Sequence, residues 1–586
     1  LYTKEGDLKN GDFFIPLNFQ IEKMDNYYVQ FIGYSGKNLA NNFFEVRFTD
    51  SQLMALNRLP VNAIAVFPEP KEIKLKNEKR QIKNGATYYL TSKEISFCAD
   101  TLKKEVERFY GISLKPTDNF KNADIIIDLN FKDPEIKEFF KSKNLLDKFE
   151  KIKYDGYLLL IDEDKMIVTG KEKRGVFYGT NVLLDLIKMT TGEVSSEVYV
   201  KNCIVVDWPD FKIRYWTDTF RGYYPAQKLP PSIYMEMIEK IPLKFRYNGF
   251  AISPADFYHW ECAPSIRLKQ GWTPEEFREL VRLLNTRYVP AVPFLYNTLG
   301  HMEWLLSYPE YSYLREDGDV YTLCTKHPDT YKVLFGFFDE LIKMTGENPE
   351  YKSEYFFAGL DEVRWKTFSV PPEKRCKYCA GIPKNIIYLE HVNKLADYLR
   401  NKGYRLIMCS DMLVEEHNGL NEFKCALIRD KLPKDIVVAH WSILDYPSIP
   451  RFKELGIENW KIDTGYKVDR LNEDLIKGRG FGVYTYNWHL SITRGNTGPF
   501  YGPVAQAIYA NACWNIFPDH NDSTWRKYEK IYGNFLMHNW SRKPLLNASK
   551  EIKIIDISSA VNTPVYDKDG NGWFELGEKS DLSLMD

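Results

Sequence analysis

From residue 208 onward, short apolar runs of strand length alternate with longer stretches in which the apolar residues have helical spacing. An apolar run that is buried on both faces is typical of a strand in a parallel sheet covered by helices. The eight runs that fit this pattern are 211–216, 249–253, 289–296, 355–360, 404–409, 436–441, 460–463 and 482–488. Eight consecutive β/α units predict a (β/α)₈ TIM barrel, which is an α/β fold.

The helix expected after the second run has the clearest start. Thr273 is followed by Pro274, and Glu276 comes three residues after the threonine, which is the pattern of a capping box with proline in the first turn. Phe277 and Leu280 then begin an apolar stripe of helical period. The main alternative to a barrel is an open, doubly wound sheet, but no Gly-rich phosphate-binding loop follows any of the eight runs.

The chain before residue 208 has a different pattern. Strand-like runs at 87–91 and 123–129 are separated by a segment with helical spacing, and a hairpin is expected from 156–161 and 165–170. An apolar helix is expected from Arg174. This mixture predicts an α+β domain with helices packed against a sheet.

Both ends of the chain indicate β structure, with expected strands at 26–32, 552–557 and 572–576. The predicted domains are a small β-rich N-terminal module (1–75), an α+β accessory domain (76–207), the (β/α)₈ catalytic barrel (208–545) and the start of a C-terminal β module (546–586).

Polar and aromatic residues follow nearly every one of the eight apolar runs. In (β/α)₈ barrels the catalytic groups lie at the C-terminal ends of the strands, and the fourth run stops abruptly at Asp361 and Glu362. The other strand ends carry Asp256, Asn297, His301, Asp411, Trp441, Tyr466 and Trp488. Carboxylates surrounded by aromatic side chains suggest a carbohydrate site.

Composition and charge narrow the classes of partner. The chain of 586 residues has 79 basic and 80 acidic side chains, so electrostatics gives no reason to expect binding to nucleic acid or to an anionic membrane. No run of about 18 apolar residues is present, so no membrane-spanning helix is expected. Nine cysteines, and first residues without the pattern of a signal peptide, favour reduced thiols and a cytoplasmic location.

Four passages, in this order, resemble glycoside hydrolase family 20, the β-N-acetylhexosaminidases, and within it the hexosaminidase D-like branch. These passages are Gly-Val-Phe-Tyr-Gly at 175–179, Asp-Trp-Pro-Asp-Phe at 207–211, Leu-Gly-His-Met-Glu at 299–303 and Gly-Leu-Asp-Glu-Val at 359–363. The resemblance implies an α+β domain before a catalytic barrel and no cofactor for catalysis. It implies as substrate a glycan or glycoside that ends in an N-acetylhexosamine. The motif departs from the family pattern His-x-Gly-Gly-Asp-Glu, because Phe357 and Leu360 replace the histidine and the second glycine.

Asp361 and Glu362 are adjacent, which limits their roles. Successive side chains of a strand point to opposite faces, so these two carboxylates do not fit the usual pair of acid and nucleophile. The resemblance implies instead that the 2-acetamido oxygen of the substrate attacks and forms an oxazolinium. Glu362 is then the general acid and later the general base, with a pKa raised by a partly apolar pocket, and Asp361 binds the acetamido N–H.

Further residues are assigned to the substrate under this resemblance. Arg214 is expected to bind sugar hydroxyls or to form a buried salt bridge, and His301 to hold a neighbouring carboxylate. Tyr466, in preference to Tyr486, is expected to donate to the acetamido oxygen. The remaining candidates are Trp441 and Trp488, which line the acetamido pocket or pack in the core, together with Asp256 and Asp411, which bind substrate unless Asp411 caps a helix. Two alternatives stay open, a glycosidase for another sugar and a carbohydrate-binding barrel that has lost catalysis.

The cysteines suggest a metal site. Cys376 and Cys379 form a Cys-x₂-Cys sequence, which suits tetrahedral zinc, in the loop after the fourth run. Cys262 and Cys324 lie in the loops after the second and third runs, on the same face of the predicted barrel. We therefore expect a structural zinc with these four ligands, with His327 as a substitute ligand; free thiols or a disulfide are the alternative.

Overall fold

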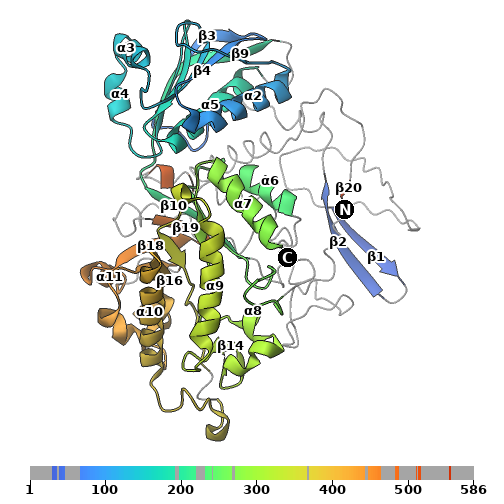
Figure 1. The fold of residues 1–586 in the computed structure, drawn as a ribbon, viewed down its shortest axis with the longest axis vertical. Coiled ribbons are helices and arrows are strands. Elements are labelled where there is room, and N and C mark those ends of the chain that lie inside the picture. Colours follow the sequence, from blue (N-terminus) through green and yellow to red (C-terminus); the bar gives the residue numbers. More distant parts are fainter. Residues whose placement is uncertain are drawn as a thin grey trace.

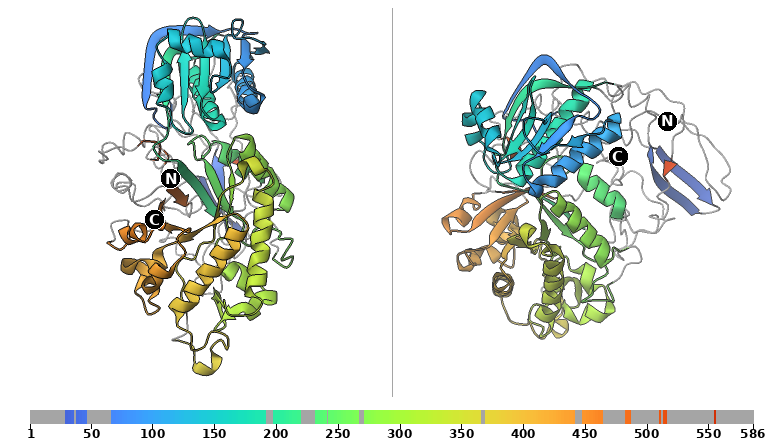
Figure 2. Two further views of the ribbon diagram at one scale, coloured as in Figure 1. Left: turned by 60° about the vertical axis from the view of Figure 1, so that its left-hand side comes forward. Right: turned by 45° about the horizontal axis from the view of Figure 1, so that its top comes forward.

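The structure is a computed structural model in which two large sheets hold most of the described chain. It describes residues 29–35, 38–46, 66–191, 197–219, 231–240, 242–266, 271–365, 369–441, 447–463, 482–486, 510, 513–515 and 554–555. A seven-stranded sheet with its helices lies at the top of the view in Figure 1, and an eight-stranded sheet with a second set of helices lies below it. Figure 2 shows the same two bodies from two further directions.

The seven-stranded sheet has the order β3-β9-β7-β8-β6-β4-β5. Its strands are β3 (Glu72–Ile82), β4 (Thr87–Leu90), β5 (Lys115–Pro116), β6 (Ile125–Leu129), β7 (Tyr157–Ile161), β8 (Met166–Gly170) and β9 (Val198–Asp207). The predicted hairpin is confirmed as the antiparallel pair of β7 and β8. The long antiparallel pair of β3 and β9 was not predicted, and the expected boundary at residue 75 falls inside β3.

Helices cover both faces of this sheet. Helices α2 (Ser96–Tyr110) and α5 (Lys173–Thr191) share one apolar core with Ile125 and Ile127 of β6. Ile126 points the other way, into a second core that includes residues of α3 (Pro134–Ser142) and α4 (Leu146–Glu150). The alternation of these three isoleucines follows from the two-residue period of a strand. The α+β character predicted for this part of the chain is therefore confirmed.

The second sheet has eight parallel strands, and each one coincides with a run predicted from the sequence. They are β10 (Ile213–Thr219), β11 (Gly249–Ser253), β12 (Ala291–Pro293), β15 (Tyr355–Phe357), β16 (Arg405–Cys409), β17 (Val437–His440), β18 (Glu458–Asp463) and β19 (Gly482–Tyr486). The last strand, β19, pairs with the first, β10. Between β12 and β15 the contact is a single parallel bridge, from Phe294 to Phe357, and we call this junction the seam.

Helices follow the strands around this sheet. They are α6 (Pro231–Lys240), α7 (Pro274–Thr286), α9 (Thr330–Thr345), α10 (Lys384–Asn401) and α11 (Pro450–Glu454). The predicted capping box of α7 is confirmed, because the Thr273 side chain accepts from the backbone of Glu276 and the Glu276 side chain accepts from the backbone of Thr273. The segments that follow β18 and β19 lie outside the described residues.

Shorter elements fill the connections. Helix α8 (Glu303–Leu306) and the hairpin of β13 (Arg315–Glu316) and β14 (Asp319–Leu323) lie between β12 and α9. The short turns of helix are η1 (Lys93–Ile95), η3 (Pro309–Leu314), η4 (Pro349–Tyr351), η5 (Pro372–Lys374), η6 (Asp411–Leu413), η7 (Glu415–Gly419) and η8 (Cys425–Lys431). None of the helices in the described ranges is long and apolar enough to cross a membrane.

A small sheet joins the two ends of the chain. Strands β1 (Val29–Ser35) and β2 (Asn38–Val46) are antiparallel, and β20 (Ile554–Ile555) pairs with β2. These strands overlap the runs predicted at 26–32 and 552–557. The strand predicted at 572–576 lies outside the described residues.

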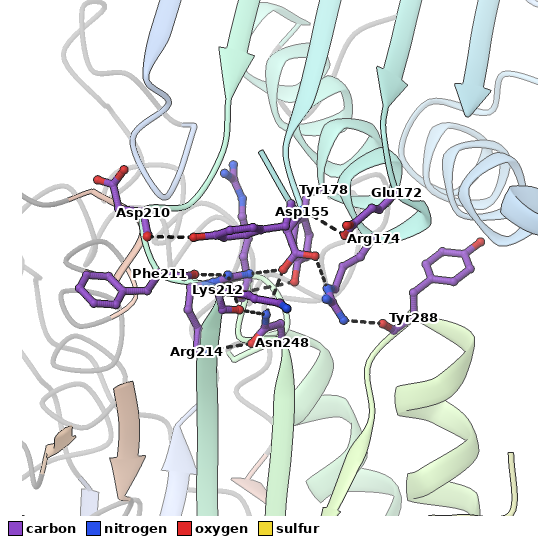
Figure 3. A network of polar contacts seen from close by, with 12 residues as sticks. Asp155, Glu172, Arg174, Tyr178, Asp210, Phe211, Lys212, Arg214, Asn248 and Tyr288 are labelled. Atoms are coloured by element: carbon purple, nitrogen blue, oxygen red, sulfur yellow. Dashed lines mark hydrogen bonds and ion pairs between the residues drawn. The ribbon is translucent and has the colours of Figure 1, made fainter. Parts of the chain in front are cut away.

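A buried network of polar residues joins the two large sheets (Figure 3). Asp155, from the turn before β7, accepts hydrogen bonds from Arg214 Nη2 at 2.8 Å, Arg174 Nε at 2.7 Å and Asn248 Nδ2 at 3.0 Å. Burial opposes ionisation of this carboxyl, but the two guanidinium groups outweigh it and lower the pKa of Asp155 to about 2. Asp155 is therefore ionised and accepts hydrogen bonds from residues of both bodies. These bonds hold the α+β body and the eight-stranded sheet together.

Candidate active site

The backbone turns sharply where β15 ends. Gly359, Leu360 and Glu362 all have positive φ angles, of 66°, 74° and 44°. A Cβ atom on Gly359 would lie 2.2 Å from the carbonyl oxygen of Tyr296, so only glycine fits there. Leu360 stands where the family motif has its second glycine, and its left-handed conformation gives the physical reason for a glycine at that position.

Contacts on both sides hold Leu360 in this conformation. Its side chain is fully buried, its N–H donates to Asn297 Oδ1 at 2.6 Å, and its carbonyl accepts from the Tyr388 hydroxyl at 3.1 Å. Strained backbone that the surrounding structure over-determines is common at functional sites. The turn thereby presents Asp361 and Glu362 at the C-terminal end of the sheet, as the sequence predicted.

Asp361 is held from the strand on the far side of the seam. Asn297, which follows β12, is buried and donates from Nδ2 to Asp361 Oδ1 at 2.7 Å. The second oxygen, Asp361 Oδ2, lies 3.9 Å from His301 Nε2. One oxygen of this carboxylate is therefore committed to Asn297, while the other faces the histidine.

Glu362 has a different set of partners. Its Oε2 atom lies 3.3 Å from His301 Nε2 and accepts a hydrogen bond from Arg364 Nη2 at 3.0 Å. Its backbone N–H donates to Asp411 Oδ2 at 2.8 Å, and its carbonyl accepts from the Tyr321 hydroxyl at 2.8 Å. The two adjacent carboxylates are thus fixed by separate groups, and the one partner that they share among the described residues is the imidazole of His301.

The pKa of Glu362 is lowered, whereas the sequence analysis expected it to be raised. The interaction with His301 is the largest cause; burial acts in the opposite direction, and the positive charge of Arg364 adds to the lowering. The expectation was wrong because it counted the apolar surroundings and not these two basic partners. Arg364 is 68% exposed, so its contribution belongs to the open, solvated site.

Asp411 is the carboxyl with the raised pKa. It is almost fully buried at the end of β16, and burial together with the charge of Asp361 raises its pKa to about 7. Its oxygens accept from Glu362 N, from Asn418 Nδ2 at 2.8 Å and from Trp441 Nε1 at 3.3 Å. Asp411 therefore positions the Glu362 backbone and the Trp441 ring.

A pocket of about 270 Å³ opens beside Glu362. One side is formed by the chain from Glu362 to Trp365, which follows β15. The opposite side is formed by Asn418, Asn421, Glu422 and Phe423, from the connection after β16. A cleft with a few convergent polar groups and carboxyls of perturbed pKa is the usual location of a ligand site.

The assignment of Arg214 to sugar hydroxyls is corrected. Arg214 lies near the N-terminal start of β10, at the end of the sheet opposite to Asp361, and it is fully buried against Asp155. It forms the buried salt bridge that the sequence analysis gave as the alternative. The predicted run ended at residue 216, but the strand extends to Thr219, so Arg214 is the second residue of β10 and lies far from its C-terminal end.

The other predicted residues divide into two groups. His301, Asp411 and Trp441 converge on the two carboxylates as expected. Asp256 lies half-buried in the turn after β11, where its charge adds to burial in raising the pKa of Tyr308. Tyr466 and Trp488 lie outside the described residues, as does the side chain of Tyr486.

Four contributors were not assigned from the sequence. Asn297 was noted as a strand-end residue without a role, and Arg364 is marked only by its place two residues after Glu362. Asn418 and Tyr321 lie on inserted segments, the turn η7 and the strand β14, and their positions depend on tertiary structure.

The structure brings together three of the four predicted metal ligands. The Sγ atom of Cys324 lies 3.3 Å from that of Cys376 and 3.3 Å from that of Cys379, and all three sulfur atoms lie within 4.8 Å of one another. Cys262 is the exception and the assignment is corrected, because it is exposed and does not belong to this cluster. Its backbone N–H donates instead to Glu340 on α9.

Comparison with known proteins gives matches for both bodies. Residues 63–208 match the family model described as glycosyl hydrolase family 20, domain 2. Among solved structures, the exo β-N-acetylglucosaminidase of Vibrio harveyi gives a TM-score of 0.61 at 15% identity, covering 82% of this chain and 79% of that one. The N-acetyl-β-hexosaminidase of Streptomyces plicatus gives 0.60 at 15% identity, covering 82% and 96%.

Curated sequences match over a smaller part of this chain, at higher identity. The lacto-N-biosidase of Bifidobacterium bifidum is 23% identical over 431 residues, which are 68% of this chain and 32% of that protein. Human hexosaminidase D is 30% identical over 101 residues, which are 17% of this chain and 20% of that protein. The chain spans about a third of the length of the first two curated relatives that it matches.

The α+β body, the parallel α/β sheet and the carboxylates at its C-terminal end are features of a glycoside hydrolase, and the comparisons support that class. Within the class, the chain is similar to the β-N-acetylhexosaminidases of glycoside hydrolase family 20. The predicted resemblance is therefore confirmed.

Proposed function

We propose that this protein is an exo-acting β-N-acetylhexosaminidase that hydrolyses terminal GlcNAc or GalNAc glycosides with retention, by substrate-assisted catalysis. We also infer that its eight-stranded sheet is a closed (β/α)₈ barrel. The pairing of β19 with β10 and the bridge across the seam support closure.

One observation carries the mechanism: the two adjacent carboxylates have separate partners. Asp361 is fixed by Asn297 through one oxygen, and Glu362 contacts His301 and Arg364 beside the pocket. A pair of equivalent carboxylates would suit an acid and a protein nucleophile. This unequal pair suits an acid and a partner that holds the substrate.

In the first step the carbonyl oxygen of the substrate's acetamido group attacks the anomeric carbon. Asp361 accepts a hydrogen bond from the acetamido N–H and stabilises the positive charge that develops there. Glu362 gives its proton to the departing glycosidic oxygen as the carbon–oxygen bond breaks. The product bound in the site is an oxazolinium.

In the second step Glu362, now a carboxylate, removes a proton from water, and the water oxygen attacks the anomeric carbon. The oxazolinium ring opens, the acetamido group is restored and the configuration is retained. Two displacements at the same carbon give this outcome, and Glu362 ends the cycle protonated.

Substrate binding supplies the protonated form of Glu362 that the first step requires. Arg364 is mostly exposed, and a sugar that enters the adjoining pocket displaces water and moves this side chain away from Glu362. Desolvation then raises the pKa of the carboxyl, while His301 stays within reach of both carboxylates.

The remaining contacts in this proposal come from several strand ends. Trp441 lines the acetamido pocket from a position fixed by Asp411. Tyr466 donates to the acetamido oxygen, Trp488 forms a second aromatic surface, and Asp256 binds a sugar hydroxyl.

A panel of aryl β-glycosides of GlcNAc, GalNAc, glucose and galactose tests the proposal. We expect turnover of the two acetamido sugars only, and competitive inhibition by a GlcNAc-derived thiazoline, a stable analogue of the oxazolinium. Turnover of glucose or galactose alone would contradict substrate assistance and support a glycosidase of another specificity. No turnover of any sugar, with thiazoline still bound, would indicate a carbohydrate-binding barrel that has lost catalysis.

A further inference from the structure

The connection from β15 to α10 is long and runs from residue 358 to residue 383. Its described residues, 358–365 and 369–383, contain one short turn of helix, η5, and little other regular structure. This loop forms the lower tip of the molecule in Figure 1. Leu360, Val363 and Trp365, in its first part, belong to the main core, whereas the apolar side chains of 376–382 form a small separate cluster with Cys324. A loop of this length without its own core usually needs another source of order.

The three thiols of this cluster have the spacing of metal ligands. Zinc bound by sulfur at about 2.3 Å in a tetrahedron holds the sulfur atoms about 3.8 Å apart. Here two of the sulfur–sulfur distances are 3.3 Å and the third is within 4.8 Å. One disulfide would use two of these sulfur atoms and leave the third out, whereas a metal ion uses all three.

The backbone and the charges around the cysteines also suit a metal. The N–H groups of Cys379 and Ala380 both donate to the carbonyl of Cys376, which makes the tight turn of a Cys-x₂-Cys ligand pair. Lys374, Arg375 and Lys377 flank the turn, and their positive charges offset the negative charge of several thiolates.

We propose that Cys324, Cys376 and Cys379 bind a structural zinc ion, with His327 as the fourth ligand after rotation of its side chain. His327 comes three residues after Cys324, and its ring contacts that of Tyr378, between the other two cysteines, at 4.8 Å between centroids. In the present conformation its Nδ1 atom accepts from the backbone N–H of Asp329 at 3.2 Å, so the rotation gives up this one hydrogen bond. Four protein ligands are typical of structural zinc.

The zinc links two segments that also meet at Glu362. Cys324 follows β14 directly, and β14 carries Tyr321, whose hydroxyl donates to the Glu362 carbonyl. Thr322, also on β14, donates to the carbonyl of Arg364 at 3.3 Å. The metal therefore holds the β13–β14 hairpin against the chain that carries Glu362, and the cysteines are positioning residues for this carboxylate. This role rests on the proposed function, whereas zinc binding does not.

Metal analysis of the purified full chain tests the binding. Under reducing conditions we expect one zinc per chain, lost in Cys376→Ser and Cys379→Ser and retained in the control Cys262→Ser, which changes an exposed thiol outside the cluster. Zinc far below one per chain after growth with added zinc would overturn the proposal, as would full retention in the Cys376→Ser variant.

Cobalt substitution tests the ligand set. We expect intense sulfur-to-cobalt charge-transfer absorption in the unchanged chain and in Cys262→Ser, reduced in each variant of the three clustered cysteines. His327→Ala should shift the visible d–d bands and weaken zinc retention against a chelator. An unchanged spectrum in His327→Ala would overturn His327 as the fourth ligand.

Hydrogen exchange tests the positioning role of the metal independently of the proposed hexosaminidase activity. On zinc removal, amides of 315–324 and 358–383 should exchange faster, while those of the distant β7–β8 hairpin should not change. If exchange became faster to the same extent in all three segments, or did not change in any of them, the positioning role would be overturned. If hexosaminidase turnover is absent from the unchanged chain, the proposed function fails, but the metal, cobalt and exchange results still decide the zinc site.

Discussion

Two buried carboxyl groups, Asp155 and Asp411, have opposite chemistry in the same chain. Asp155 lies between two guanidinium groups at the contact of the two bodies, and its pKa is lowered to about 2. Asp411 lies beside Asp361 without a cation among its hydrogen-bond donors, and its pKa is raised to about 7. Burial acts alike on both, so the neighbours decide the outcome. The negative charge is neutralised at the contact of the two bodies, and it is left beside a second carboxylate at the proposed active site.

The largest effect is expected on the active-site side of this comparison. Glu362→Gln removes the proton donor while keeping the shape of the side chain, so kcat on aryl GlcNAc should fall by about 10²–10⁴-fold. The loss should be smaller for substrates with acidic leaving groups, because these need less protonation. Steady-state kinetics across a leaving-group series measures this. Activity equal to that of the unchanged chain would refute the assignment of the acid.

The structural side of the comparison is tested by Asp155→Asn. The change leaves Arg174 and Arg214 without their buried counter-charge, so unfolding should become easier by about 3–5 kcal/mol. Denaturant unfolding followed by circular dichroism measures the difference. The control is Asp164→Asn, in which an exposed aspartate loses a surface ion pair with Lys143, and its effect should be below about 1 kcal/mol. Equal effects in the two variants would argue against the network as the source of stability.

The pH dependence of the free energy of unfolding should show the contribution of Asp155. Because the pKa of Asp155 is lower in the folded state than in the unfolded state, its contribution is present above about pH 4 and is lost as the pH falls through about 2. The part of the stability lost over this window should be about 2–3 kcal/mol. Thermal melts at a series of acidic pH values check this, and the pH slope of Asp155→Asn in the same window should be shallower.

The smallest expected effect is the change in stability and in kcat/KM that follows ionisation of Asp411. Its folded pKa is raised, so its neutral form predominates below about pH 7, and stability from this group falls as the pH rises from about 4 to about 7. Above pH 7 the ionised group adds a second negative charge beside Asp361, and kcat/KM should fall several-fold. In Asp411→Asn this alkaline decline should move to higher pH. An unmoved decline would assign the titration to another group.

The hydrophobic pattern predicted most of the fold because it depends on local burial. All eight parallel strands appear where apolar runs such as 249–253 and 404–409 indicated them, since a strand covered on both faces has to be apolar throughout. The pair β3 and β9 was missed. β3 lies at the edge of its sheet with an exposed middle, so its sequence contains many charged residues and lacks an apolar run.

The sequence predicted the position of the two central carboxylates of the site, but it predicted the residues around them less well. Asp361 and Glu362 follow an apolar run directly, so their position at a strand end is a local property. Arg214 was assigned wrongly because β10 extends to Thr219, three residues beyond the predicted run, which leaves Arg214 at its start. Cys262 was assigned wrongly because the loops that meet in space are set by tertiary packing. The lowered pKa of Glu362 depends on His301, which is distant in sequence.

The seam between β12 and β15 has a consequence for how the enzyme would lose activity. Asn297 and His301 come from one side of this junction and Asp361 and Glu362 from the other, and the strands themselves meet through a single bridge. The proposed catalytic groups are therefore assembled across the junction with the fewest paired residues in the eight-stranded sheet. A slight opening there would separate acid from partner while the helices and the other strand pairs stayed intact. Turnover would then report on contact across the seam, and it would disappear at lower denaturant concentrations than the circular dichroism signal.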